Sequence, residues 1–437
     1  MTSPREGGGM NTPAPSRRRS GTRWRIAWVA AAAGLAAVAG CSSSSSSSPA
    51  STSGSASAGT ASAATASASA AASSGTGAAT SSNAVSTAAT AALQAWIKGS
   101  QTTPPTTGPK AQKGKSIWVL SCGQAAAACA YWANSVVQAG QAIGWKVTLY
   151  DDKLIPANGN TGLEDAVAAH ADGAIVLGNS CPQNEQGLKA AKAAHMPVVG
   201  IDEDDCDDPV FGGSGPQLIT GLKYTAAYPT VDSFLEANGT LQADYLLAHL
   251  GSSANVIEFK STDIISKELV NKGFEAEYKK LCPSCKLTQV PYSLTDMIGG
   301  QLKTKAQDAL ESDSGANGIE VTADSDIGLV LGPVVDSSAQ AGKILVVGAE
   351  GLSSNITAAR SGQWESAGSG EPFNWEAWAA VDAMNRLFAG SPQVDSGIGL
   401  QLWSVKPTQV NLPAAGQNYD PPGINFEADY KKLWGVS

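Results

Sequence analysis

The chain contains 437 residues, of which 38 are acidic and 29 are basic, and its formal net charge is −9. This excess of negative charge argues against nucleic acid or an anionic lipid surface as the ligand, and it is compatible with a neutral or cationic small molecule. The length exceeds what a single hydrophobic core usually covers, so two lobes are expected.

The first 40 residues have the layout of a secretory signal peptide. Five arginines between residues 17 and 25 form a basic region, and residues 26–40 follow without a charge. This apolar run is shorter than the roughly 20 residues that a membrane-spanning helix needs. Residues 1–40 carry six arginines and one glutamate, so their removal leaves a net charge of −14.

The tetrapeptide VAGC, residues 38–41, resembles a bacterial lipobox. The resemblance implies cleavage before Cys41 and a lipid on its sulfur and amine. Lipid chains would anchor the chain to the outer face of the cell membrane without a spanning helix. The alternative is an ordinary signal peptide followed by an incidental cysteine.

Residues 41–111 are predicted to be a disordered tether rich in Ser, Ala and Thr. Residues 42–90 carry no charge and almost no large apolar side chain. Such a segment cannot bury enough surface to offset its ordering entropy, and it behaves as a flexible coil. A short helix is expected over 91–98 (AALQAWIK), and 102–109 (TTPPTTGP) is expected to be a stiff, extended entry to the folded part.

From residue 112 onward, the hydrophobic pattern alternates between strand and helix. The strands are short and largely apolar, which is typical of parallel strands buried on both faces and joined by right-handed helical crossovers. The alternating pattern occurs twice in tandem, with a junction near 222–232. It predicts an α/β protein of two Rossmann-like lobes. The predicted strands are 116–120, 146–150, 173–177, 197–201, 255–259, 286–291, 318–322 and 343–348, and the predicted helices are 129–143, 160–171, 183–194, 235–250, 266–281, 298–311, 327–339 and 353–360.

Six cysteines remain when Cys41 is set aside, and sequence alone allows fifteen pairings of six. Their positions favour disulfides that join residues close to the same strand ends or in one short motif. The alternative for the C-P-S-C motif is a zinc half-site or a redox centre, but the sequence has no second C-x-x-C and only three histidines. No metal site is therefore expected. The predicted pairs are Cys122–Cys129, Cys181–Cys206 and Cys282–Cys285.

The strands end in polar residues, and this is where a ligand is expected. In open parallel sheets, ligands bind outside the carboxyl ends of the strands. Aromatic side chains near the same ends would suit a sugar ring or a cation. The candidate ligand-binding residues are Gln124, Tyr131, Trp132, Asp151, Asn179, Asp202 and Glu203 in the first half, and Lys260, Asp324, Glu350 and Trp375 later in the chain.

Several segments in this order resemble the type I periplasmic binding proteins, in particular the ribose-binding-like branch. They are KSIWVLSCG, ADGAIVLG, MPVVGIDED, ILVVGAEG and NYDPPGINFEADYKKLWG, and the resemblance covers about residues 112–437. It implies a solute-binding lipoprotein of a bacterial ABC importer, a monomer whose lobes are joined by three crossings. The first lobe would comprise 112–228 plus 371–395, and the second 229–370 plus 396–437.

The resemblance carries over to individual residues only in part. Asp202 stands where family members use an aspartate for sugar hydroxyls, but the next position, often arginine, is Glu203. Glu350 stands where an aspartate is usual. The family's sugar-binding arginine corresponds to Val270, and Ala323 replaces a commonly polar residue. These departures favour a sugar derivative over a plain pentose or hexose.

Other function classes lack their signatures in this sequence. It contains no G-x-S-x-G, no Walker loop and no G-x-G-x-x-G after a strand. Neither an enzyme nor a cofactor is therefore expected. An acidic cleft would also suit an amino-bearing or cationic solute, and the run at 202–208 (DEDDCDD) is either a solvated loop or a Ca²⁺ loop. Ligand sensing for a membrane receptor, rather than transport, is a further alternative.

Overall fold

The computed structural model describes residues 76–437. The predicted signal peptide, Cys41 and residues 42–75 of the predicted tether lie outside the described residues. Within 76–437, no helix is both long enough and apolar enough to cross a lipid bilayer.

The first lobe is built on a five-stranded parallel sheet with the strand order β2-β1-β3-β4-β5. The strand β3 is buried along its whole length, as its uninterrupted apolar sequence GAIVL predicts. The strands are β1 (Ser116–Ser121), β2 (Lys146–Asp151), β3 (Gly173–Leu177), β4 (Val198–Ile201) and β5 (Thr220–Gly221), and the helices between them are α2 (Ala127–Ile143), α3 (Asn158–Ala168), α4 (Cys181–Ala193) and the short η1 (Pro209–Phe211).

The second lobe repeats this plan with a six-stranded sheet of order β11-β10-β9-β8-β6-β7, parallel except for β11. The helix expected at 327–339 is instead the short α9, a π-helical turn η3 and α10. The strands are β6 (Asn255–Ser261), β7 (Lys286–Tyr292), β8 (Gly318–Val321), β9 (Leu345–Gly348), β10 (Ala367–Gly370) and β11 (Gln401–Ser404). The helices are α5 (Val231–Leu250), η2 (Gly251–Ser253), α6 (Ile265–Leu281), α7 (Leu294–Ile298), α8 (Gln301–Ser312), α9 (Asp324–Asp326), η3 (Ile327–Leu331), α10 (Gly332–Ser337) and α11 (Ser353–Arg360). The predicted α/β class with two helix-flanked sheets is confirmed.

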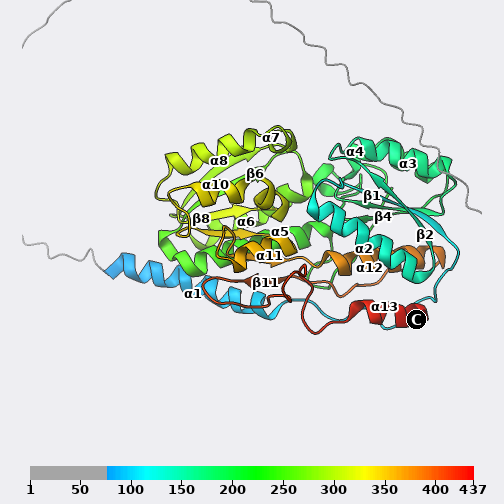
Figure 1. Ribbon diagram of the computed structural model, residues 1–437. Helices are drawn as coiled ribbons and strands as arrows, with labels where there is room; N and C mark the ends of the chain where they lie inside the picture. The colour runs from blue at the N-terminus through cyan, green and yellow to red at the C-terminus, as the bar shows by residue number, and fades with distance from the viewer. Residues whose placement is uncertain (1–75) are drawn as a thin grey trace, which may run out of the picture. The chain divides into compact units, whose positions relative to one another are not determined.

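The end of the chain passes between the lobes more often than predicted. The helix α12 (Phe373–Phe388) packs on α2 and β4 of the first lobe, and the chain then returns to β11 of the second. The last helix, α13 (Phe426–Trp434), lies against α12 and α2 (Figure 1). Trp434 stacks on Trp378 and donates its Nε1 hydrogen to Asp382 at 2.8 Å. The tail, predicted to belong wholly to the second lobe, therefore ends on the first, because α13 finds its apolar partner there.

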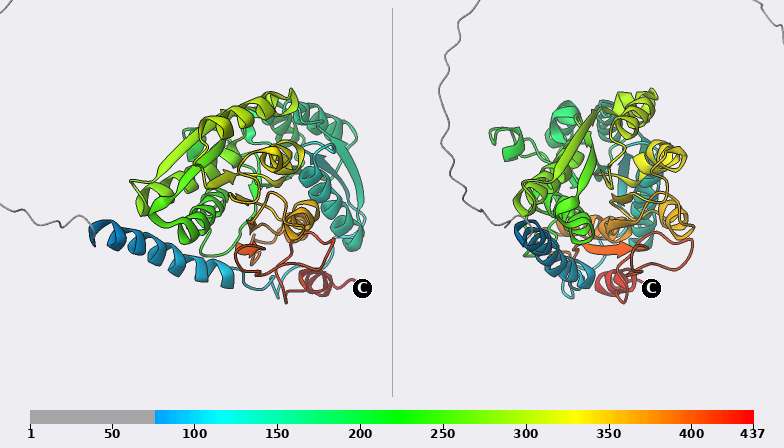
Figure 2. Two further views of the ribbon diagram at one scale, coloured as in Figure 1. Left: turned by 60° about the vertical axis from the view of Figure 1, so that its left-hand side comes forward. Right: turned by 90° about the vertical axis from the view of Figure 1, so that its left-hand side faces the viewer.

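The helix α1 (Thr76–Lys98) corrects the predicted tether, which was expected to be flexible as far as residue 90. It packs along α5 and β11 of the second lobe (Figures 1 and 2). Ala89 and Leu93 are buried, and Trp96 Nε1 donates to Asp244 Oδ2 at 2.7 Å. The alanine content favours a helix, and the second lobe covers its few apolar side chains.

The predicted extended entry segment and the residues just before it run beside the loop that leads into β11. The amide of Ser100 donates to the carbonyl of Leu400 at 3.0 Å, and that of Thr102 donates to Gly397 at 2.8 Å. Further on, the amide of Ala111 donates to the carbonyl of Trp434. Residues 99–111 therefore form another connection from the second lobe to the first.

The three predicted disulfides are present in the structure. Their Cα–Cα distances are 5.5, 5.1 and 5.3 Å, within the normal range. They link the loop after β1 to α2, the start of α4 to the loop after β4, and the two cysteines of C-P-S-C between α6 and β7 (Cys122–Cys129, Cys181–Cys206 and Cys282–Cys285).

Candidate ligand-binding site

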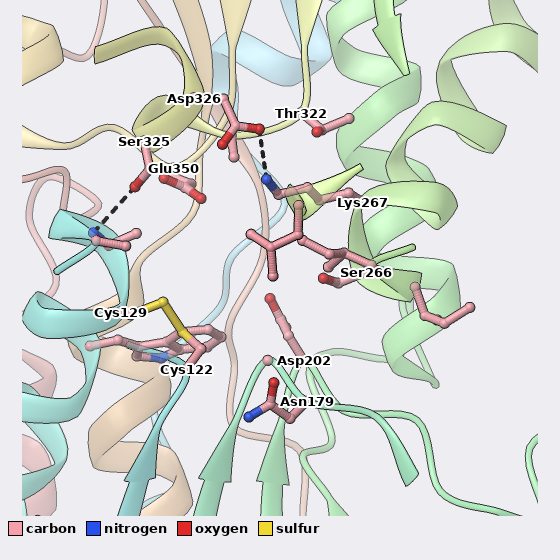
Figure 3. Close-up of a pocket in the computed structure, with 18 of the residues that line it drawn as sticks. Cys122, Cys129, Asn179, Asp202, Ser266, Lys267, Thr322, Ser325, Asp326 and Glu350 are labelled. Carbon is pink, nitrogen blue, oxygen red and sulfur yellow. Dashed lines mark hydrogen bonds and ion pairs between the residues drawn. A yellow bond between two sulfur atoms is a disulfide. The ribbon is translucent and has the colours of Figure 1, made fainter. Parts of the chain in front are cut away.

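A cavity of about 140 Å³ lies between the two lobes, at the carboxyl ends of both sheets (Figure 3). This volume is many times what one water molecule requires, so the cavity has room for a small solute. Both lobes and the hinge contribute polar side chains. They are Asn179, Ser180, Gln183 and Asp202 from the first lobe, Ser266, Lys267, Thr322, Ser325, Asp326 and Glu350 from the second, and Glu371 from the hinge.

The first lobe presents an amide and a carboxylate to the cavity. Asn179 follows β3, and its Nδ2 donates to the buried Asp152 at 2.5 Å. This leaves the Oδ1 of Asn179 as the group available to a solute. Asp202 follows β4, and its Oδ1 accepts a hydrogen bond from the hydroxyl of Tyr224 at 2.9 Å. The hydrogen bonds fix both side chains in place before any solute enters, which is the condition for preorganised binding.

The second lobe presents an ion pair. The ammonium group of Lys267, in the first turn of α6, lies 2.6 Å from Asp326 Oδ2. The hydroxyl of Tyr292 also donates to Asp326. Asp326 is only 1% exposed and Lys267 16%, so water screens their interaction weakly. Figure 3 shows both side chains on the side of the cavity opposite Asp202.

Asp202 and Glu350 occupy matching positions in the two halves. Asp202 is the first residue after β4, and Glu350 is the second residue after β9. Both have a left-handed backbone, with φ of 51° for Asp202 and 65° for Glu350. This conformation is uncommon for residues other than glycine, and it is retained mainly at functional sites. The turn aims both carboxyl groups at the space between the sheets.

One wall of the cavity is apolar. The indole of Trp132 stacks on Phe373 with 4.5 Å between ring centroids and 18° between planes. The disulfide between Cys122 and Cys129 continues this wall, and Val270 of α6 adds an apolar side chain to the cavity from the second lobe. A flat apolar wall opposite polar groups suits the C–H face of a ring that carries hydroxyl groups.

Acidic groups dominate the electrostatics of the cavity. Among the described residues that line it, Lys267 is the single cationic side chain, against four carboxyl groups, those of Asp202, Asp326, Glu350 and Glu371. Burial raises the pKa of Asp202, Glu350 and Glu371 above the usual range. For Glu350, the nearby carboxylate of Asp324 raises the pKa further and the charge of Lys267 opposes the rise.

Residues 119–392 match the family model described as the periplasmic binding protein domain. The chain belongs to the periplasmic binding protein family. Members of this family bind solutes, and the chain is not an enzyme.

Solved structures with the same fold have low sequence identity to this binding protein. A galactofuranose-binding protein is 18% identical, with a TM-score of 0.56, and the match covers 67% of this chain and 95% of the other. An ABC transporter solute-binding protein from Mycobacterium smegmatis with bound glycerol is 17% identical (TM-score 0.56; 68% and 99% covered). The arabinose-binding component from Shewanella sp. ANA-3 is 15% identical (TM-score 0.53; 66% and 91% covered). No curated protein sequence matches the chain.

Four of the residues predicted from the sequence line the cavity of the binding protein: Trp132, Asn179, Asp202 and Glu350. All four stand at or just after a strand end, or on the helix that follows β1. The cavity therefore lies at the carboxyl ends of the parallel strands, where the sequence predicts a ligand.

Four other candidates at the same strand ends support the loops instead. Asp151 accepts the backbone N–H of Gln124 at 2.9 Å, which makes both part of a turn. Glu203 accepts the backbone N–H of Asn179 at 2.5 Å behind the cavity wall. Asp324 accepts the amides at positions 351 and 352 at 2.9 and 2.7 Å, holding the Glu350 loop. A carboxylate that accepts nearby backbone N–H groups helps to hold a loop and has fewer free oxygen atoms for a ligand.

Three further candidates point elsewhere. Lys260 forms an ion pair with Glu275 on α6, outside the cavity. Trp375 is fully buried and stacks on Phe426, so it belongs to the core. Tyr131 lies on a different face of α2 from Trp132, and burial is the main cause that raises its pKa.

The acidic run at 202–208 is used largely within the fold. Asp205 accepts backbone N–H groups from Cys206, Leu218 and Ile219, at 2.8–3.0 Å. Asp208 caps the short helix η1 through the amide of Val210. Asp205 and Asp208 therefore have hydrogen-bond partners within the fold.

The sequence prediction missed Lys267, Asp326 and Glu371. Lys267 lies at the start of a helix, and Glu371 directly follows β10, whose sequence AGSG lacks the apolar run by which the other strands were predicted. Asp326 stands two residues after Asp324 at the same strand end, and this spacing is the signal that could have identified it.

Proposed function

We propose that this protein captures a small polar solute, a sugar or sugar derivative, and delivers it to an ABC importer in the membrane. In this proposal residues 1–40 are removed, and lipid on Cys41 holds the protein at the outer face of the cell membrane. The observation that carries the proposal is the cavity itself, because both lobes line it with fixed hydrogen-bonding groups beside an aromatic wall.

Binding would work by closure of the lobes on the solute. Asn179 and Asp202 would bind one side of the solute, and Lys267 and Glu350 the other. A solute that contacts both lobes binds the closed state more tightly than the open one, and so shifts the population toward it. The importer would then recognise the outer surface of the closed form.

A second candidate solute is one that carries an amino group. Four carboxyl groups face the cavity against one lysine, and Val270 replaces the arginine that the family resemblance would lead one to expect. Such a cavity suits an amino sugar or another cationic solute as well as a neutral sugar.

The test is a thermal-shift screen of monosaccharides, polyols and amines, preceded by native mass spectrometry of the purified protein. A ligand that binds only the folded state raises Tm according to the ratio of its concentration to Kd. A hit among sugars or polyols supports the main proposal, and a hit only among amines supports the second candidate. The absence of a hit in all three classes would contradict both. The intact mass also reports whether Cys41 carries lipid.

We expect Asp202→Ala and Glu350→Ala each to weaken binding of the identified solute at least tenfold, because each removes a charge-assisted hydrogen bond. Calorimetry measures the affinity, and circular dichroism checks the fold. The control is Glu185→Ala, which removes an exposed acid that pairs with Lys189 on α4. Unchanged affinity in both cavity variants would contradict the site assignment.

A further inference from the structure

Three carboxyl groups meet beneath the cavity, and we call them the hinge triad: Asp202, Glu371 and Glu376. Asp202 follows β4, Glu371 lies between β10 and α12, and Glu376 is in the first turn of α12. One oxygen atom from each lies within 4.8 Å of the other two. The three residues are 7%, 5% and 0% exposed.

Only part of the hinge triad has the partners that buried carboxylates normally have, and Asp202 and Glu371 hydrogen-bond each other. Tyr224 donates to Asp202 Oδ1 at 2.9 Å, and Asn238 donates to Glu371 Oε2 at 3.3 Å. The remaining oxygen of Glu371 and both oxygens of Glu376 have no hydrogen-bond partner. Among the described residues, the ion pairs all involve other carboxylates. Because an unpaired buried carboxylate is costly, this cluster needs a positive charge or bound protons.

The spacing fits one bound cation. Ca²⁺ binds carboxylate oxygens at about 2.3–2.6 Å, so two oxygens on opposite sides of the ion lie about 5 Å apart. The oxygens of the hinge triad fall within this limit. Carboxylates are ligands that suit hard cations such as Ca²⁺.

We propose that the hinge triad binds one Ca²⁺ ion. Asp202 and Glu371 line the cavity, which supplies the entry path, and oxygens of water or of the solute complete the coordination. Glu376 lies behind them and does not line the cavity, so it is the triad member that distinguishes ion binding from solute binding. The site is independent of the identity of the solute.

A neighbouring group of acids provides the control. Asp204, Asp208 and Asp232 also bring oxygens within 4.8 Å of one another, but Asp208 and Asp232 are only partly buried. Asp208 already accepts the amide of Val210 at 2.8 Å. We therefore expect this second group not to bind Ca²⁺ with comparable affinity.

The experiment is a calorimetric titration of the purified full chain with CaCl₂, after chelator treatment and dialysis, without solute. We expect one Ca²⁺ per chain, an affinity at least tenfold lower for Glu376→Gln, and an affinity within twofold of the original for Asp208→Asn. Circular dichroism checks that each variant is folded. Should Glu376→Gln fail to fold, Glu371→Gln replaces it, and Tb³⁺ luminescence sensitised by Tyr224 reports the site in the unaltered chain.

The proposal is overturned if the unaltered chain binds no Ca²⁺ at millimolar concentration, which would indicate a triad neutralised by protons. Retained affinity in Glu376→Gln, or loss of binding in Asp208→Asn, also overturns it by placing the ion elsewhere. Solute binding is measured separately, by the thermal-shift screen. A failure of the Ca²⁺ titration therefore leaves the proposed transport function standing. A failure of the solute screen likewise leaves the proposed Ca²⁺ site standing.

Discussion

Lys267 has a central position among the single residues of the cavity. Its ammonium group pairs with the almost fully buried Asp326. Its charge also stabilises the ionised form of the buried Glu350. Both acids lose this compensation when the lysine is removed, and a buried charge that loses its partner is strongly destabilising. Lys267 therefore links the electrostatics of the cavity to the stability of the second lobe.

We expect Lys267→Met to weaken solute binding at least tenfold and to lower the free energy of unfolding by about 3 kcal/mol, because Asp326 is left buried and unpaired. Calorimetry and thermal unfolding measure the two effects. The matched control is Lys260→Met in the same lobe, whose half-buried pair with Glu275 lies outside the cavity. Equal effects of the two substitutions on affinity would contradict this assignment.

At the level of elements, the cavity depends on how closely α5 and α6 approach each other. A Cβ atom added to Gly239 would lie 1.9 Å from the carbonyl oxygen of Val270, and one added to Gly273 would lie 1.9 Å from that of Glu236. The two helices therefore touch backbone to backbone. This contact sets the position of α6, which carries Lys267 and Val270 into the cavity.

We expect Gly273→Ala to lower the free energy of unfolding by about 1–3 kcal/mol and to weaken solute binding, because the added methyl group forces α6 away from α5. Chemical denaturation and calorimetry measure the two quantities. Gly221→Ala is the control, since a Cβ there meets open space. A change of less than about 0.5 kcal/mol in Gly273→Ala, the range of neutral surface substitutions, would refute the close packing.

At the level of the whole molecule, several acidic side chains among the described residues are buried and have raised pKa values. Burial raises the pKa of Asp152 to about 7, that of Glu258 to about 7 and that of Glu365 to about 8. An acid whose pKa is higher in the folded state than in the unfolded state binds its proton more tightly when folded. Stability from such groups is present at low pH and is lost as pH rises between the two pKa values.

We therefore expect the free energy of unfolding to fall between pH 5 and pH 8, on the order of 1–4 kcal/mol for each such acid. Asp152→Asn should reduce this slope, because burial and the charge of Asp151 raise the pKa of Asp152. Denaturant unfolding across this pH range measures both curves. A stability that rises toward pH 8, or an unchanged slope in Asp152→Asn, would count against the assignment.

The strand ends show how far local sequence can locate a site. A strand that is buried on both faces needs an uninterrupted apolar run, so β3, β4 and β9 and the polar residues after them are encoded over a few consecutive positions. For this reason the sequence could predict that Asn179, Asp202 and Glu350 lie at the strand ends, where the structure places the cavity. Which neighbouring acid faces the cavity could not, because Glu203 and Asp324 differ from them only in the backbone amides that they meet.

The sequence alone determined the α/β class with its two halves, and it predicted the disulfide pairs and the polar residues at the strand ends, because each follows from periodicity or spacing along the chain. Only the tertiary structure decided the helical state of residues 76–90, the return of α13 to the first lobe, and the position of Lys267 and Glu371 at one cavity with Glu376 behind it. These features depend on contacts between segments far apart in the chain. Their free energy comes from burial against a distant partner, which local propensity does not contain.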